Sequence, residues 1–436
     1  IPYFFLGLAA VLAAAALFIL ISRMGANSKN SSDVPNKNQA AIPNQKLTPT
    51  VRAELVKDPA AELEKTMKEL GAGAAMADAN ALIAQFAKAL EAGDLAKVIK
   101  LSGKNALDSQ TLARFKALSL NPLKLRPVDG IREIGELELN KRSRWVLEIE
   151  GREPGFNRIF LDLSKTDGKW SIEKMILPPS LGEATDESAI VDSLGVADSF
   201  LQALLKQNFP YAKTLVDPAT VSDAKIAGLC ILFEEGGYRP RKNKPLRFMF
   251  ERKNTVNYLV TIETSDAKQS AQFALNMSKI QTSSKWIVSE INLDQLLADY
   301  ARRMGGGDLY YAPLVKNPAG GDTLALYFEF DEDQINPRTR RQLEIVTKIL
   351  SADPNKKIHL SGHADALGSA DYNNSLSSRR ADVVRDSLIL AGVSSAQIVT
   401  IAKGASQPRR PNATESGADN PDGRRANRRT EIYLDF

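Results

Sequence analysis

The spacing of hydrophobic and polar positions changes several times along the chain, and the first segment is apolar throughout. IPYFFLGLAAVLAAAALFILI runs from Ile1 to Ile21 without a charged side chain. At about 1.5 Å per residue, a helix of this length spans about 30 Å, the thickness of a bilayer core. The pattern predicts a transmembrane helix at 1–22. A signal peptide is the alternative, but its apolar region is shorter and precedes small residues, whereas this segment ends in FILISR.

Residues 23–76 show no sustained apolar period. From Met24 to about Thr50 the chain is rich in Asn, Ser, Lys and Pro, a composition typical of a disordered tether. A short helix candidate follows in RAELVKDPAAELEKTMKELGAG, interrupted by Pro59.

A helical period followed by alternating strands then occurs twice. FAKALEAGDLAKVIKL resembles FLQALLKQNFPYAKTLV, and FLDLSKTDGKWSIEKMIL resembles FALNMSKIQTSSKWIVSEINL. The interval from Phe86 to Trp170 nearly equals that from Phe200 to Trp286. Alternating runs such as RWVLEIEG and NYLVTIETS predict strands. Helices followed by an antiparallel sheet indicate an α+β class for each unit.

These two predicted repeats cover 77–186 and 187–303. Their order of helices and curved sheet resembles the cone-shaped fold of nuclear transport factor two and its relatives. The resemblance implies either an enzyme or a non-catalytic module, because fold alone does not decide function. Neither histidine lies in this region. We expect the 77–303 repeats to bind protein partners, with a small-molecule or catalytic pocket in the cone as the alternative.

The last part of the chain alternates between strand and helix. Residues 304–321 are glycine-rich and predict a linker before a domain at 322–436. TLALYFEF predicts a strand, a helix begins near Pro337, KKIHLSG predicts a second strand, and a second helix runs from Tyr372 to about Ala391. AQIVTIAKG and RRTEIYLDF complete a β-α-β-α-β-β order, which predicts two layers with the helices on one face.

One charged residue interrupts the apolar side of that second helix. Arg380 falls in the same arc as Leu376, Val384 and Leu388. An arginine inside an apolar stripe is costly unless an anion meets it. The pattern therefore predicts either an internal carboxylate as its partner or the carboxylate of a bound ligand.

Composition narrows the chemistry. The chain has 57 basic and 52 acidic residues and a formal charge of +5, a balance that does not indicate nucleic-acid binding. The single cysteine, Cys230, sits in the apolar run IAGLCILF and permits no internal disulfide. Two histidines and one cysteine do not suggest a metal site. With no nucleophile or phosphate-binding motif either, we expect a protein that is not an enzyme and carries neither metal nor cofactor.

Four motifs then follow one another in a specific order: FEFDEDQI, GHADALGSADYNNSLSSRRA, GASQPRRPN and NRRTEI. Together they resemble the OmpA-like peptidoglycan-binding domain, over about Leu324 to Phe436, roughly a quarter of the chain. The resemblance implies non-covalent, non-catalytic recognition of the diaminopimelate in the peptidoglycan stem peptide. By motif position, Asp365 would accept from the ligand's ammonium, and Arg380 would bind its carboxylate with two parallel hydrogen bonds.

The same resemblance assigns lesser roles to five further residues. Asn373 would offer an amide to the ligand, although asparagine near a helix start is also a common cap. Phe330 and Asp331, at the end of the first strand, would make backbone contacts. Arg428 and Arg429 match the closing motif, and strand alternation lets only one of them face the ligand. We expect the arginines of PRRPN and DGRRANRR to form a solvated basic loop.

Ala364 and His363 precede Asp365 in the same loop. Ala364 stands where family members often have threonine, and the missing hydroxyl weakens ligand binding by roughly 0.5–1.5 kcal/mol if it served as a hydrogen-bonding group. His363 titrates near neutral pH when it is accessible, but a structural hydrogen bond is the commoner role for such a residue.

These predictions combine into a single-pass protein of the inner membrane, with the bulk of the chain in the periplasm of a diderm bacterium. It would tether the membrane or an envelope complex to peptidoglycan. One alternative is a structural subunit of a secretion or motility complex. Another is a stator-like protein of an ion-driven motor, which the segment 1–22 disfavours because it contains no Asp or Glu.

Overall fold

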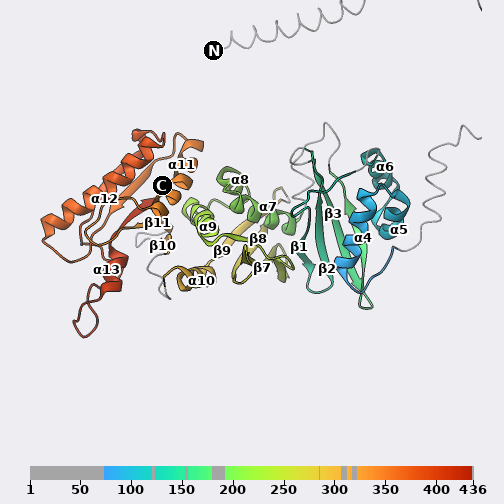
Figure 1. Ribbon diagram of the computed structural model, residues 1–436, viewed down its shortest axis with the longest axis horizontal. Coiled ribbons are helices and arrows are strands. Elements are labelled where there is room, and N and C mark those ends of the chain that lie inside the picture. The colour runs from blue at the N-terminus through green and yellow to red at the C-terminus, as the bar shows by residue number, and fades with distance from the viewer. Residues whose placement is uncertain are drawn as a thin grey trace, which may run out of the picture. The chain divides into compact units, whose positions relative to one another are not determined.

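The computed structural model describes residues 73–119, 123–152, 156–178, 192–283, 285–305, 312–316 and 322–434 (Figure 1). All of them belong to one compact unit, Ala60–Phe436. The predicted transmembrane helix at 1–22 and most of the predicted tether at 23–76 lie outside these ranges. Among the helices that the structure describes, none combines the length and the apolar character needed to cross a membrane.

The first group of elements has three helices followed by four strands. They are α4 (Ala79–Glu91), α5 (Leu95–Ala106), α6 (Ser109–Leu118), β1 (Ile131–Glu138), β2 (Arg142–Glu148), β3 (Arg158–Thr166) and β4 (Lys169–Ile176). Each helix begins after an aspartate, Asp78, Asp94 or Asp108, whose carboxylate accepts N–H bonds from the first turn. The buried sides of the helices and one face of the strands share a core that includes Phe86 and Trp145.

The second group has the same order of helices and strands and ends in one more helix. Its elements are α7 (Ser193–Leu205), α8 (Phe209–Thr214), α9 (Asp223–Gly236), β5 (Tyr238–Pro240), β6 (Leu246–Arg252), β7 (Thr255–Thr264), β8 (Ser270–Lys279), β9 (Trp286–Asn292) and α10 (Asp294–Gly305). Cys230 is buried in α9, where burial raises the pKa of its thiol to about 12. The relation of the two groups as repeats, and their resemblance to the cone-shaped fold, stay predictions.

The strands of both groups form one nine-stranded sheet. Its order is β4-β3-β2-β1-β6-β7-β8-β9, with β5 paired to β7. All its pairings are antiparallel except that of β1 with β6, which is parallel and has a single residue pair, Gly135 with Leu246. A Cβ atom at Gly135 would lie 2.3 Å from the carbonyl oxygen of Leu246. Only glycine therefore permits the close approach that joins the two groups.

The C-terminal domain has a five-stranded sheet of order β10-β11-β14-β12-β13. Its elements are β10 (Leu314–Lys316), β11 (Asp322–Tyr327), α11 (Pro337–Ala352), β12 (Ile358–Gly362), α12 (Ala370–Leu390), the 3-10 helix η2 (Ser395–Gln397), β13 (Ile398–Ala402), α13 (Pro421–Asn427) and β14 (Arg429–Tyr433). From β11 onward the predicted β-α-β-α-β-β order is present, with a short extra helix, α13, before the last strand. One part of the expected linker at 304–321 is a strand, β10, which pairs with β11.

Side chains connect the second group to the C-terminal domain. The carboxylate of Glu235, near the end of α9, accepts from Arg338 Nε at 3.0 Å and from Gln342 Nε2 at 2.7 Å, both on α11. The hydroxyl of Tyr300 on α10 also donates to Glu235. Apolar side chains of both regions belong to one continuous core. A buried, hydrogen-bonded carboxylate thus holds the start of α11 against α9.

Candidate functional site

The candidate site lies where β12 ends and α12 passes beside it. Gly362, the last residue of β12, approaches the helix so closely that a Cβ atom there would lie 1.9 Å from the carbonyl oxygen of Ser377. The loop that follows is fixed by the N–H of Ala364, which donates to the carbonyl of Gly404 at 2.9 Å. Strand, loop and helix therefore bring Asp365 and Arg380 to the same end of the sheet.

Asp365 is buried, with 5% of its surface exposed. Its Oδ2 accepts from Arg428 Nη1 at 3.0 Å, and Arg424 Nε lies 3.8 Å from the same oxygen. Its Oδ1 accepts from the N–H of Leu367 at 3.1 Å, which closes a short turn. The carboxylate is thus held in one orientation, with two arginine side chains around one of its oxygens.

Arg380 has no exposed surface, and its bonding partners are backbone carbonyls. Nε donates to Glu332 at 2.9 Å, Nη1 to His363 at 3.0 Å and Nη2 to Glu329 at 3.2 Å. Its guanidinium carbon lies 5.3 Å from the ring centre of Phe328. Among the described residues, Arg380 does have a partner inside the protein, but it consists of backbone carbonyls and not of the expected carboxylate. A guanidinium has more N–H groups than these three bonds use.

Several charged side chains lie around Asp365. Arg424 and Arg428 contact its carboxylate, and Arg424 also pairs with Asp419. The charge of Arg380 interacts with Asp365, Asp333 and Asp331. Burial, together with the nearby charge of Arg428, lowers the pKa of Arg380 to about 10. Within the described part of the chain, the Nε atoms of Arg424 and Arg428 are buried without a hydrogen-bond acceptor. Buried guanidinium donors without an acceptor favour an anionic ligand.

The loop between β11 and α11 covers Arg380. Phe330 and Asp331 lie in this loop, beyond the end of β11 at Tyr327, and not in the first strand as the motif predicts. Phe330 is 60% exposed, and its ring centre lies 5.9 Å from the guanidinium carbon of Arg428. Asp331 has a left-handed backbone with φ of 56° and accepts from the hydroxyl of Tyr372. Arg380 lies beneath this loop, with no surface exposed.

The other predicted site residues are Arg428, Arg429 and Asn373. Arg428 faces Asp365, whereas Arg429 turns away and donates from Nε to Glu431 at 2.7 Å, so only one of the pair reaches the site. Asn373 is buried in the first turn of α12. The cap of that helix is Ser369, whose hydroxyl accepts from the N–H of Tyr372, so capping does not explain Asn373.

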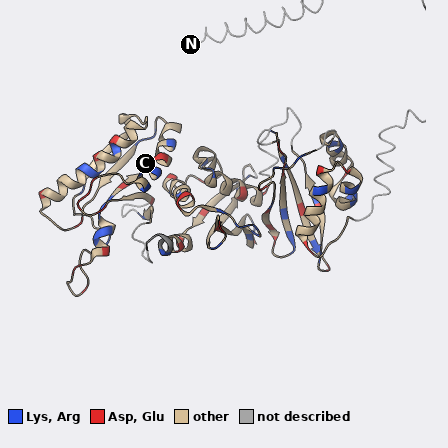
Figure 2. Ribbon diagram, in the orientation of Figure 1, with Lys and Arg blue, Asp and Glu red and all other residues tan. Residues whose placement is uncertain are grey.

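Arg424 is a site residue that the sequence interpretation missed. The run DGRRANRR predicted a solvated loop, but its residues up to Asn427 belong to helix α13, with Asn420 as cap and Pro421 at the first position. Arg424 and Arg428 are four residues apart, a spacing that puts two side chains on the same face of a helix. Both point toward Asp365, and α13 appears as a largely basic helix in Figure 2. The Asn-Pro pair was the signal that could have revealed this helix.

His363 is buried behind the site rather than exposed in the loop. Its Nε2 lies 3.7 Å from Glu431, and burial lowers its pKa despite this neighbour. Burial would raise the pKa of Glu431, but His363 and Arg429 outweigh it and lower that pKa to about 2. In the described residues, no group of three or more His, Cys, Asp or Glu side chains could hold a metal ion.

Comparison with known proteins places this site in a family. Residues 327–421 match the OmpA family. The photosystem I P700 chlorophyll a apoprotein A2 of Gloeobacter violaceus is 32% identical over 109 residues, which are 25% of this chain and 12% of that protein. The peptidoglycan-associated lipoprotein of Buchnera aphidicola is 38% identical over 88 residues, 20% of this chain and 50% of that protein.

A solved structure is similar over the same region. The crystal structure of the peptidoglycan-associated lipoprotein from Burkholderia pseudomallei is 28% identical, covers 25% of this chain and 86% of that one, and gives a TM-score of 0.23. The chain therefore carries a C-terminal OmpA-like domain. It spans half or less of the length of the two curated relatives named above.

Proposed function

We propose that this chain is a non-catalytic protein of the bacterial envelope whose C-terminal OmpA-like domain binds the peptidoglycan stem peptide. The observation that carries the proposal is the buried contact of Asp365 with Arg424 and Arg428, whose Nε atoms lack an acceptor, at the same end of the sheet as the fully buried Arg380. Diaminopimelate ends in an amino acid centre with one ammonium and one carboxylate. A site with one fixed carboxylate and guanidinium donors without an acceptor complements both groups.

Each ligand group has a partner in this proposal. Asp365 accepts from the ammonium, since its carboxylate is held in one orientation by Arg428 and by the N–H of Leu367. The ligand carboxylate binds Arg380, after the loop from Glu329 to Glu332 has moved, and the unused Nε donor of Arg428 supports it. Phe330, exposed at the rim of the site, contacts the aliphatic part of the ligand. Asn373 supplies an amide from the first turn of α12.

Binding to purified peptidoglycan tests the proposal. The full chain is sedimented with insoluble peptidoglycan, with Asp365→Asn and Arg380→Lys as the variants. Asp365→Asn keeps the shape of the side chain but removes its charge, and lysine keeps the charge of Arg380 but loses its planar fork. We expect both variants to lose most of the binding. Arg425→Lys is the matched control, because Arg425 is half exposed on α13 and pairs with Asp422.

A pair of competitors tests which ligand group is recognised. The first is a soluble stem peptide that contains diaminopimelate. The second is the same peptide with lysine, which has the ammonium but lacks the terminal carboxylate. Competition by the first alone is the expected result. If wild-type protein stays in the supernatant, or if both variants sediment normally while remaining folded, Asp365 and Arg380 do not form a peptidoglycan site.

The proposal extends to the rest of the chain. The apolar segment 1–22 would anchor the protein in the inner membrane, with the folded region in the periplasm. The domain would then tether the membrane, or an envelope complex bound through residues 77–303, to the cell wall. Fractionation of cells that express the chain with and without residues 1–22 tests this anchor. Recovery of the full chain in the soluble fraction would refute it.

A further inference from the structure

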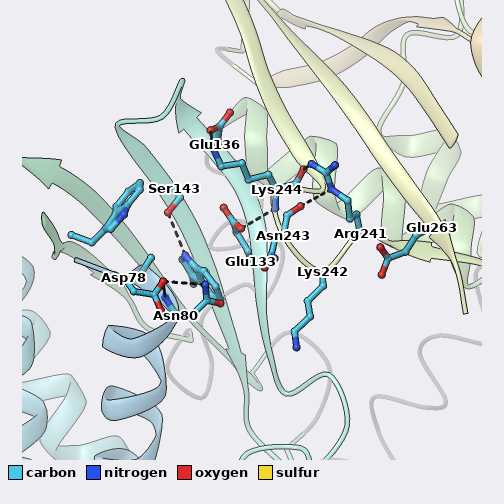
Figure 3. A pocket seen from close by; sticks show the side chains of 13 residues that line it. Asp78, Asn80, Glu133, Glu136, Ser143, Arg241, Lys242, Asn243, Lys244 and Glu263 are labelled. Atoms are coloured by element: carbon cyan, nitrogen blue, oxygen red, sulfur yellow. Dashed lines mark hydrogen bonds and ion pairs between the residues drawn. The ribbon is translucent and has the colours of Figure 1, made fainter. Parts of the chain in front are cut away.

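A cavity of about 490 Å³ lies far along the chain from the peptidoglycan site, between the first and second groups of elements. Its walls are the start of α4, strands β1, β2 and β4, the loop between β5 and β6, and Glu263 of β7, which pairs with Arg239. Figure 3 shows Asp78, Asn80 and Ser143 on one side of Glu133, and the residues of the 241–244 loop on the other. The volume is in the range of ordinary small-molecule sites.

Two irregularities in β1 direct its acidic side chains to this cavity. In a regular strand, Glu133 and Glu136 would point to opposite faces, because they are three residues apart. The pairing of β1 with β2 shifts between Glu133 and Gly135 and again between Glu136 and Glu138. A β-bulge of this kind redirects the side chains that flank it. Both carboxylates consequently line the same cavity.

These carboxylates are buried and incompletely paired. Glu133 is 7% exposed, and its carboxylate accepts from the backbone N–H of Lys244 at 2.8 Å. Burial raises its pKa. Glu136 is 1% exposed, and its Oε1 accepts from Lys244 Nζ at 2.7 Å. Its Oε2 has no hydrogen-bond partner in the described residues. A buried carboxylate oxygen without a donor is costly, so a cationic donor entering the cavity would be stabilised.

The basic residues of the cavity do not compensate for these oxygens. Lys244 already bonds both Glu136 and the side chain of Asn140. Arg241 donates to the carbonyls of Asn243 and Lys244 within its own loop. The side chain of Lys242 is exposed. Cationic groups are therefore present at the wall, but none of them is bonded to Glu136 Oε2.

Two tryptophans give the cavity an apolar side. Trp145 is paired with Glu133 across β1 and β2, and its Nε1 donates to Ser143 at 3.3 Å. Trp170 of β4 also lines the cavity and is half buried. Indole rings attract ammonium groups through their faces and pack against methylene chains. The cavity thus combines buried acceptors with aromatic surface.

We propose that this cavity binds a ligand that carries a primary ammonium at the end of a short aliphatic chain. The ammonium donates to Glu136 Oε2 and to the Glu133 carboxylate, and the methylene groups pack on Trp145 and Trp170. Such a group could belong to a free diamine or to a lysine side chain of a peptide. The binding does not depend on the peptidoglycan site, so either proposal can fail without the other.

Isothermal titration of the full chain tests this site with three probes. They are 1,5-diaminopentane, Nα-acetyl-lysine amide and 1,5-pentanediol, the last being a neutral analogue of the diamine. We expect the diamine or the lysine derivative to bind and the diol not to bind. Preferential binding of the diamine identifies a free amine as the ligand, whereas preference for the lysine derivative identifies a peptide side chain.

Two variants and one control complete the experiment. Glu133→Gln keeps an acceptor for the N–H of Lys244 but removes the charge, and we expect it to weaken binding by at least about tenfold. Asp78→Asn is the second variant and replaces Glu133→Gln if that protein fails to fold. It removes a charge from the exposed wall of the cavity, and asparagine still caps α4. Glu290→Gln, on the exposed side of β9, is the control. Absence of binding at millimolar concentrations, equal binding of the diol, or unchanged affinity in the folded variants would overturn the proposal.

Discussion

Arg380→Met separates a structural role of this arginine from a role in ligand binding. The substitution removes the guanidinium and its three bonds to backbone carbonyls, while a methionine of similar length still fills the space between α12 and the loop above it. Two of those carbonyls, at Glu329 and Glu332, lie on exposed loop residues, so water can replace the arginine there. The carbonyl of His363 is deeper in the fold.

Two opposing contributions decide how much Arg380→Met changes the free energy of unfolding. Because water can replace two of the three acceptors, each bond from this charged donor contributes about 1.5 kcal/mol, or about 4.5 kcal/mol in total, to the free energy of unfolding. Against this, the pKa of Arg380 is lowered to about 10, below its ordinary value of 12.5, so the folded state disfavours the charged form at neutral pH. That difference costs about 3 kcal/mol. We therefore expect Arg380→Met to lower the free energy of unfolding by only about 0–2 kcal/mol, including a small packing loss.

Hydrogen exchange measured by mass spectrometry is the appropriate assay. The chain contains several structural regions, so a single global unfolding transition does not report on this site alone. The tryptophans Trp145, Trp170 and Trp286 all lie before the C-terminal domain, which excludes their fluorescence as a probe. Exchange of amides in β12 and α12 gives the free energy of opening of this region directly.

The two readouts together decide the role. We expect Arg380→Met to keep most of the amide protection of β12 and α12 and to lose binding to peptidoglycan. A loss of protection above about 4 kcal/mol would show that the hydrogen bonds of Arg380 far outweigh the cost of burying its charge. The arginine would then have a structural role, holding the loop against the strand. Retention of both protection and binding would refute the ligand role.

Two further predictions concern the same domain. Gly362→Ala is expected to destabilise this domain by at least about 3 kcal/mol, because the new methyl group would overlap the carbonyl of Ser377. Hydrogen exchange measures the effect, and Ala364→Gly, at a nearby buried loop position, is the control. The pKa of Glu431 is about 2 in the folded state and about 4.5 when unperturbed. Glu431 therefore contributes roughly 3 kcal/mol to the free energy of unfolding above pH 4.5, and this contribution is lost as the pH falls toward 2. Urea unfolding across this pH range, followed through the exchange protection of amides in β14 rather than a global signal, should show the loss, and Glu431→Gln should flatten it. An equally steep pH dependence in the variant would contradict the assignment.

Several features of the C-terminal domain follow from local sequence signals. Pro337 occupies the first turn of α11 after the cap Asn336, and the apolar period of that helix matches its buried side. Strand β12 and helix α12 also lie where the alternating and helical periods place them. These signals are local, because a cap or a period depends on residues within one or two turns of the chain.

The bonding of Arg380 is different, because it depends on residues distant in sequence. The helix period shows that this side chain points into the fold, which the structure confirms. It cannot show that backbone carbonyls at Glu329, Glu332 and His363 converge on the guanidinium, since every residue carries the same carbonyl group. The prediction of an anionic partner rested on side chains alone. It therefore left out the backbone acceptors that an arginine can use as well.

The cavity beside β1 shows the same limit of prediction from sequence, in this case for a strand. In IREIGELE, strict alternation would place Glu133 and Glu136 on opposite faces of the sheet, so the sequence indicates two unrelated surface carboxylates. The bulges that bring them together depend on the register with β2 and on the contact of Gly135 with β6, from a region more than a hundred residues away. If the bulges exist to direct these carboxylates, Gly135→Ala should disturb the cavity through Leu246 without touching either acid. A ligand site of this kind is defined by strand pairing, and no pattern within one strand contains that information.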